Sequence, residues 1–214
     1  MVPSSPPPIS VTPDLSKPET DKEILARFNQ LTVYKAVRGN VNTLVLQEGA
    51  TSTIIAAGSV NPYSGNHAGF DKAFFSPHGN YIVIKVFANG EYEVWVYDIA
   101  HHHVVLSTGG ADGGHFNAAE SLYYICDANR VAGGTVRVYS VPDFAVKTDL
   151  LDMFPQFDLI HFMSWNCTED AARNLIMFNF SDPAATSSYN QATSTGAYKL
   201  FEVNATTGVL QDVK

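Results

Sequence analysis

The chain has 214 residues, of which 45% are hydrophobic and 16% charged, and its net charge is −8. This length suffices for a domain with a buried core, and the hydrophobic fraction excludes a wholly disordered chain. The acidic balance disfavours contact with nucleic-acid phosphates, and no apolar run reaches the roughly 18 residues of a membrane-spanning helix. We therefore expect protein partners, with neither nucleic acid nor membrane.

Residues 1–19 are predicted to form an extended, proline-rich arm, because six of the 11 prolines lie there and proline restricts φ. The segment lacks the basic and apolar regions of a signal peptide, so we expect a cytoplasmic or virion-associated protein. Such an arm is either a free terminus or a segment that docks on another chain. We expect docking, through Pro6, Pro7, Pro8, Ile9, Val11 and Leu15.

Residues 20–30 are predicted to form one short helix. Thr20 and Glu23 fit a capping box, in which each side chain satisfies a free backbone amide of the other. Ile24, Leu25 and Phe28 then fall on one helical face, which we expect to pack on the following domain.

Residues 31–214 have the pattern of a single β domain. Short runs rich in β-branched and aromatic residues alternate with Gly, Asn, Asp and Pro, and the spacing predicts about fifteen strands. The strands repeat: residues 75–84 align with residues 116–125, and residues 94–98 with residues 136–140. A third copy starts at residue 162 and contains a polar insertion at 181–196, whereas residues 31–57 form a copy without its first strand. Four-stranded antiparallel units of this length are typical of propeller blades.

The repeated segments resemble WD-repeat and YVTN-type β-propellers. Residues 75–81 are similar to the turn between the first two strands of those blades, and Gly114-His115 is similar to the Gly-His pair of a WD repeat. The closing Trp-Asp pair is replaced by Tyr97-Asp98, Tyr139-Ser140 and Phe201-Glu202. The resemblance implies an all-β, propeller-like fold with about three complete antiparallel blades and one partial blade, preceded by the arm and the helix.

Three His/Asp pairs lie in the connections that lead into successive blades, which a propeller gathers around its channel mouth. They are candidates for acid–base or metal chemistry, or they hold their own loops in place. The pairs are His67 with Asp71, Asp112 with His115, and Asp158 with His161.

Other polar and sulfur-containing residues suggest no chemistry. The three histidines at 101–103 fall in a turn without a further ligand, and no segment has the spacing of a metal site, so we expect neither metal nor cofactor. Cys126 and Cys167 are expected to be a buried thiol and a loop thiol.

These features favour a non-enzymatic propeller-type scaffold that acts through protein–protein contacts in an oligomeric assembly, such as a virion or a phage tail. The small number of blades leaves sheet edges that invite pairing with other chains, so a homo-oligomer or a larger assembly is expected. Two alternatives stay open. One is an enzyme similar to lactonase-like or quinoprotein-like propellers, with a His/Asp site at the channel mouth, and the other is a fragment of a longer propeller protein.

Overall fold

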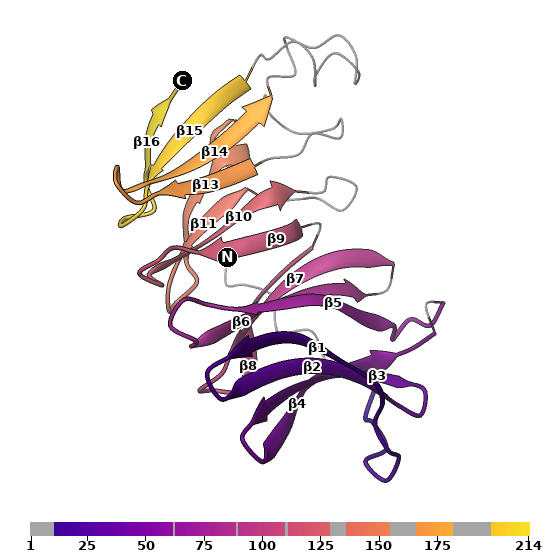
Figure 1. Ribbon diagram of the computed structural model, residues 1–214. Coiled ribbons are helices and arrows are strands. Elements are labelled where there is room, and N and C mark those ends of the chain that lie inside the picture. Colours follow the sequence, from indigo (N-terminus) through magenta and orange to yellow (C-terminus); the bar gives the residue numbers. More distant parts are fainter. Residues whose placement is uncertain are drawn as a thin grey trace. The chain divides into compact units, whose positions relative to one another are not determined.

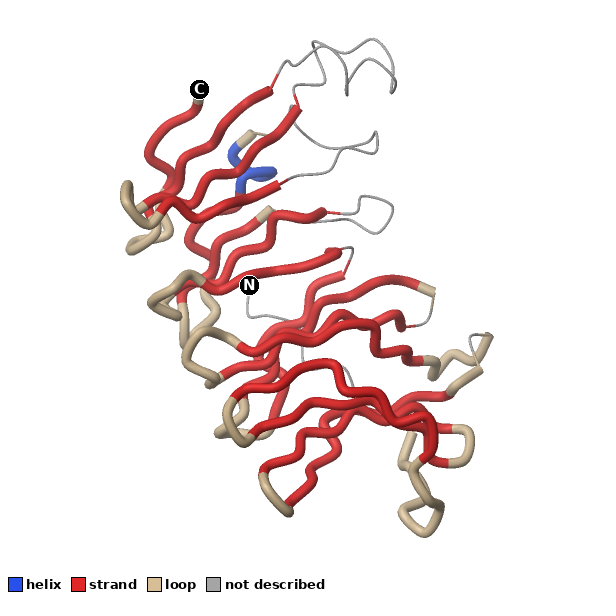
Figure 2. The backbone as a smooth tube through the Cα atoms, viewed as in Figure 1, coloured by secondary structure: helices blue, strands red, loops and turns tan. Residues whose placement is uncertain are grey.

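A computed structural model describes residues 11–61, 63–88, 90–109, 111–128, 136–154, 166–181 and 198–214. These residues form four four-stranded antiparallel sheets and one short helix (Figure 1; Figure 2). Within each sheet the strands are neighbours in chain order, which is the arrangement of a propeller blade. The predicted all-β, propeller-like fold is therefore confirmed. The chain divides into two compact units, Met1–Gly109 and Gly110–Lys214.

Unit 1 contains two blades that share one hydrophobic core. Its buried side chains include Val33 and Leu44 from the first blade and Ile82, Ile84 and Trp95 from the second. The first blade consists of β1 (Thr20–Phe28), β2 (Leu31–Arg38), β3 (Val41–Glu48) and β4 (Thr51–Ser59). The second consists of β5 (Ala68–Phe75), β6 (Tyr81–Ala88), β7 (Glu91–Asp98) and β8 (His103–Gly109).

Unit 2 also contains two blades, and its core includes Leu122, Val138, Ile176, Phe178 and Phe201. The first of these blades consists of β9 (Ala111–Phe116), β10 (Leu122–Ala128), β11 (Arg137–Ser140) and β12 (Val146–Asp149), followed by helix α1 (Leu150–Met153). The second consists of β13 (Asn166–Asp170), β14 (Leu175–Ser181), β15 (Tyr198–Asn204) and β16 (Leu210–Val213).

The predicted helix at residues 20–30 is wrong, because Thr20–Phe28 is strand β1. A two-residue turn with Asn29 at φ 52° leads directly into β2, which pairs with β1 along its length. The Phe28 ring packs against the Phe75 ring of the second blade, with 5.6 Å between the ring centres. Pairing and packing thus outweigh a local capping signal that is weak in so short a segment. The blade predicted to be partial is complete, so the described residues form four complete blades.

The structure confirms the predicted repeat, because aligned residues of two blades form the same backbone hydrogen bond. The amide of Ser76 donates to the carbonyl of Tyr81 at 3.0 Å, and the amide of the aligned Asn117 donates to the carbonyl of Leu122 at 3.0 Å. The strand register nevertheless corrects the last copy. Tyr81 pairs with Asp98 and Leu122 with Ser140, and the equivalent partner of Leu175 is Asn204. The closing dipeptide of the last blade is therefore Val203-Asn204 and not Phe201-Glu202.

Cys167 lies in β13 and is disulfide-bonded, so the expectation of a loop thiol is wrong. The sequence contains one other cysteine, Cys126. None of the helices within the described ranges has the length and apolar character needed to cross a membrane.

Candidate functional site

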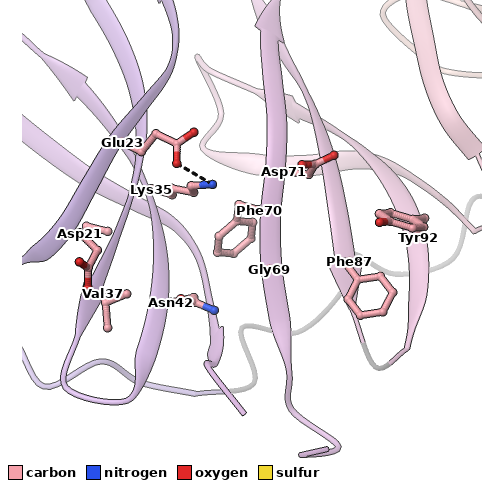
Figure 3. A pocket seen from close by; sticks show the side chains of 11 residues that line it. Asp21, Glu23, Lys35, Val37, Asn42, Gly69, Phe70, Asp71, Phe87 and Tyr92 are labelled. Atoms are coloured by element: carbon pink, nitrogen blue, oxygen red, sulfur yellow. Dashed lines mark ion pairs between the residues drawn. The ribbon is translucent and has the colours of Figure 1, made fainter. Parts of the chain in front are cut away.

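A pocket of about 420 Å³ lies between the two blades of unit 1 (Figure 3). Consecutive strands of an antiparallel sheet alternate in direction. In the first blade the starts of β1 and β3 therefore lie beside the end of β2, and in the second blade the starts of β5 and β7 lie beside the end of β6. The lining residues come from this end of both blades. The volume lies in the range of sites that hold a small ligand or a large side chain.

Carboxylates exceed ammonium groups around the pocket. Lys35 Nζ lies 2.9 Å from Glu23 Oε2, and this ion pair is visible in Figure 3. On the other blade, Asp71 Oδ2 lies 4.0 Å from the ammonium of Lys85. Asp21, at φ 51°, adds a third carboxylate. The lining thus holds three carboxylates and one ammonium group, and the ammonium of Lys85, which lies outside the lining, reduces the net charge from −2 to −1.

Aromatic rings form the wall on the side of the second blade (Figure 3). The Phe87 and Tyr92 rings lie 5.0 Å apart at an angle of 59°, and Lys85 Nζ lies 4.4 Å from the centre of the Tyr92 ring. The Tyr92 ring therefore already attracts one cation.

His67 is nine-tenths buried, and its ring is oriented by a hydrogen bond. Its Nδ1 lies 2.9 Å from the carbonyl oxygen of Ser59. A carbonyl only accepts, so Nδ1 carries the hydrogen and Nε2 is the acceptor of the neutral ring. A Cβ on Gly69, which lines the pocket, would lie 3.8 Å from this Nε2. The described residues give Nε2 no hydrogen-bond partner. His67 itself does not line the pocket, but its acceptor lies next to the lining residue Gly69.

The loop between β4 and β5 is held by its own polar groups. The amide of Asn61 donates to Ser59 Oγ at 3.1 Å, and the amide of Tyr63 donates to Asn61 Oδ1 at 3.0 Å. The amide of Val60 donates to the carbonyl of Asn40, at 3.0 Å, and so ties the loop to the β2–β3 hairpin. Tyr63 is nevertheless 95% exposed. The loop therefore presents an aromatic side chain to solvent from a hydrogen-bonded frame.

The described part of the arm is anchored to the same hairpin. Arg38 Nη2 lies 2.8 Å from Glu19 Oε1, and Arg38 Nη1 donates to the carbonyl of Lys17 at 3.0 Å. The preceding turn is closed by Asp14, whose Oδ1 accepts hydrogen bonds from the amide and the hydroxyl of Ser16. Leu15, on this turn, is 68% exposed.

The structure tests the predicted site residues only in part. Of the arm residues, Val11 is half-buried and Leu15 is exposed, while Pro6, Pro7, Pro8 and Ile9 lie outside the described residues.

The His/Asp pairs are described only in part. His67 and Asp71 lie two residues before and after Gly69 in unit 1. Asp112 and His115 share β9 in unit 2, where the centre of the His115 ring lies 5.9 Å from that of the Tyr124 ring. Asp158 and His161 lie outside the described residues, so the expected convergence of the three pairs stays a prediction.

The histidines at 101–103 belong to the turn between β7 and β8. His101 Nδ1 lies 2.9 Å from Asp98 Oδ2, and the Tyr97 hydroxyl lies 3.2 Å from His102 Nδ1. Within the described ranges, no three His, Cys, Asp or Glu side chains form a cluster suited to a metal ion.

Sequence reasoning named Asp71 as a candidate but missed the aromatic residues and the other acidic residues of the pocket. The spacing of Lys85 and Phe87 on β6 indicates that the two side chains share one face of the strand. It does not indicate that this face borders a pocket. The contribution of Glu23 and Lys35 depended on β1 being a strand.

The sequence matches no protein-family model and no curated protein. Among solved structures, an acylaminoacyl peptidase in complex with Z-Gly-Gly-Phe-chloromethyl ketone is 12% identical over 92% of this chain, with a TM-score of 0.50. The β-propeller domain of the Trilobed protease from Pyrococcus furiosus is 13% identical over 92%, with a TM-score of 0.46. The Myceliophteria thermophila Cps50 (Swd1) β-propeller domain is 11% identical over 92%, with a TM-score of 0.43.

The chain spans less than two thirds of each of these structures: 32% of the peptidase, 56% of the protease propeller and 60% of the Cps50 domain. At such low identity, the similarity concerns the fold alone.

Proposed function

We propose that the chain is a non-enzymatic, propeller-type recognition subunit that acts through protein–protein contacts and assembles with further copies of itself. One observation carries this proposal. Leu15 and Tyr63 are exposed on two hydrogen-bonded turns, and these turns are anchored to Arg38 and Asn40 of the same β-hairpin.

Preformed exposure of this kind suits a contact surface. A large apolar side chain on a fixed turn loses little conformational entropy when a partner covers it. Tyrosine in particular combines a wide apolar face with a hydroxyl, and it is enriched among the residues that dominate binding energy. The arm and the β4–β5 loop together would thus form one recognition surface at the pocket end of unit 1.

The state of the titratable groups around the pocket supports a binding role over a catalytic one. Lys35 is paired with Glu23, Asp71 faces Lys85, and His67 donates its ring hydrogen to a backbone carbonyl. Each of these contacts restrains a group that acid–base chemistry would need to be free. The disulfide at Cys167 suits an oxidising setting such as the surface of a virion, which we include in the proposal.

Light scattering coupled to size-exclusion chromatography tests the proposal on the full chain. The mass is expected to be a discrete multiple of 23.3 kDa. Leu15→Ser and Tyr63→Ser are each expected to shift the mass toward that of the monomer at a concentration where the wild type is assembled. Val146→Ser is the matched control, since Val146 is 49% exposed but lies in unit 2. A monomer at every concentration, or variants that assemble as well as the wild type, would overturn the proposal.

A further inference from the structure

We propose that the pocket between the two blades of unit 1 binds an arginine side chain of a partner protein chain. This inference rests on the proposed function, because it names the chemistry that the recognition surface selects in its partner.

The charge of the pocket calls for one cation. The ammonium of Lys35 is neutralised by Glu23, and the ammonium of Lys85 faces Asp71. Asp21 is then the surplus carboxylate: within the described ranges its hydrogen-bond partner is the hydroxyl of Thr20, 3.2 Å from Oδ2. A single positive group would bring the net charge of the pocket to zero, whereas an anion would add to the existing repulsion.

A neutral acceptor in the pocket lining and one next to it also favour a donor. His67 Nε2 is an acceptor beside Gly69, and it belongs to a side chain that is nine-tenths buried. Asn42 Nδ2 donates to the carbonyl of Ala68 at 2.9 Å, so its Oδ1 is left as a further acceptor. A guanidinium carries five N–H donors and no acceptor, so it complements this set better than a ligand with mixed groups.

The aromatic wall distinguishes a guanidinium from an ammonium. Phe87 and Tyr92 offer ring surface, and Phe70 of β5, also from the second blade, is a third aromatic residue of the lining (Figure 3). A planar, weakly hydrated guanidinium stacks on such rings and keeps its edge donors for carboxylates, whereas a compact ammonium is more costly to dehydrate. The apolar stem of arginine would fill the space between the rings.

The location of the pocket indicates a side chain on a protein partner. The pocket residues Val37 and Asn42 lie on either side of the turn of the β2–β3 hairpin. The turns that carry Leu15 and Tyr63 are anchored to the same hairpin. A partner segment that covers these exposed side chains therefore passes the same end of the blades.

Isothermal titration of the full chain with short blocked peptides tests the inference. The probe is acetyl-Gly-Arg-Gly-amide, and its neutral isostere carries citrulline in place of arginine. We expect saturable binding of the arginine peptide that weakens with added salt, and binding of the citrulline peptide weaker by at least about tenfold. Agmatine tests whether a free small molecule with a guanidinium group binds instead, and it is expected to bind more weakly than the peptide.

Two variants and one control locate the binding. Asp21→Asn is expected to weaken the arginine peptide by about tenfold, since it removes the surplus carboxylate of the pocket. Gly69→Ala is expected to weaken it because the added methyl group occupies the space beside His67, while its nearest neighbours at 3.8 Å leave the fold unstrained. Gly113→Ala is the control: a Cβ there has no atom within 4 Å, and Gly113 lies in unit 2.

Three results would overturn the inference: no saturable binding of the arginine peptide, equal binding of the citrulline peptide, or unchanged binding by both variants. Agmatine binding as tightly as the peptide would overturn the assignment to a partner chain. Light scattering on the same samples separates this failure from that of the proposed function. A chain that assembles through Leu15 and Tyr63 but ignores the peptide refutes the arginine pocket alone, whereas a monomer that binds the peptide refutes the assembly alone.

Discussion

Asn117 joins the two blades of unit 2, because its Nδ2 donates to the carbonyl of Ala205 at 2.8 Å across 88 residues of sequence. Only 2% of Asn117 is exposed. Its Oδ1 accepts hydrogen bonds from the amides of Ser121 and Leu122, both at 2.9 Å. One buried side-chain amide thus closes the turn between β9 and β10 and fastens it to the turn after β15.

Replacement of Asn117 is expected to destabilise unit 2 strongly. Asn117→Ala removes the partner of the buried Leu122 amide, of the part-buried Ser121 amide and of the buried Ala205 carbonyl, which predicts a loss of about 2–4 kcal/mol in the free energy of unfolding. The aligned residue of the second blade, Ser76, receives one such bond, from the amide of Tyr81 at 3.0 Å. Ser76→Ala is therefore expected to cost about 1 kcal/mol. Urea unfolding followed by circular dichroism measures both, and equal losses would contradict the role assigned to Asn117.

The sequence predicts the position of Asn117 but not its bond to Ala205. Alignment of residues 75–84 with 116–125 shows that Ser76 and Asn117 are equivalent, and the structure confirms it. Which turn of the next blade lies within reach depends on how blades pack, and a repeat pattern carries no such information. The same limit hid the pocket, whose walls come from two blades.

Strand β1 shows a different limit of sequence reasoning. The pattern of Thr20, Glu23 and Leu25 suits a helix locally, but a strand is favoured once β2 offers hydrogen bonds to it and Lys35 offers an ion pair to Glu23. Both partners lie outside the segment, so its own residues could not reveal them.

Gly114 is expected to tolerate no side chain. A Cβ there would overlap the hydroxyl of Tyr123 and would lie 2.5 Å from Tyr123 Cζ. Tyr123 is fully buried, so its ring has no free space into which it can move. Gly114→Ala should therefore lower the free energy of unfolding by about 1–3 kcal/mol through overpacking.

Two comparisons check this explanation by thermal unfolding. Gly113→Ala, one residue earlier in β9, meets no atom within 4 Å and is expected to cause no loss. The Tyr123 hydroxyl is buried without a hydrogen-bond partner in the described part of the chain, so Tyr123→Phe is expected to stabilise the protein by about 1 kcal/mol. Equal effects of the two glycine substitutions would contradict the steric argument.

The turn between β7 and β8 is expected to weaken in acid. Burial acts to raise the pKa of Asp98, but hydrogen bonds from the ring and the amide of His101, with the charges of His101 and His103, hold this pKa below its usual value. A carboxyl whose pKa is lower in the folded state contributes its full stabilisation above the unfolded pKa and loses it as the pH falls through the folded pKa.

Comparison with Asp98→Asn separates the contribution of the Asp98 carboxylate to stability from that of the other acidic side chains. The difference in unfolding free energy between wild type and variant should be constant from about pH 5 to 6 and should shrink below about pH 4. Chemical unfolding at a series of pH values measures it. A difference that is as large at pH 3 as at pH 6 would show that the Asp98 carboxylate does not stabilise the turn.

Reduction is expected to destabilise unit 2. Cys167, in β13, is disulfide-bonded, and the neighbouring Phe178 of β14 belongs to the buried core of the unit. A cross-link removes conformations from the unfolded chain, so its loss typically costs about 2–5 kcal/mol. Cys167→Ser and treatment of the wild type with a reductant should therefore lower the melting temperature of unit 2 by similar amounts, and the reductant should have no further effect on the variant. Thiol labelling before and after reduction provides the chemical check: the native chain should react only after reduction. A thiol that is labelled in the folded, unreduced protein would contradict the cross-link and would restore the loop thiol that the sequence alone suggests.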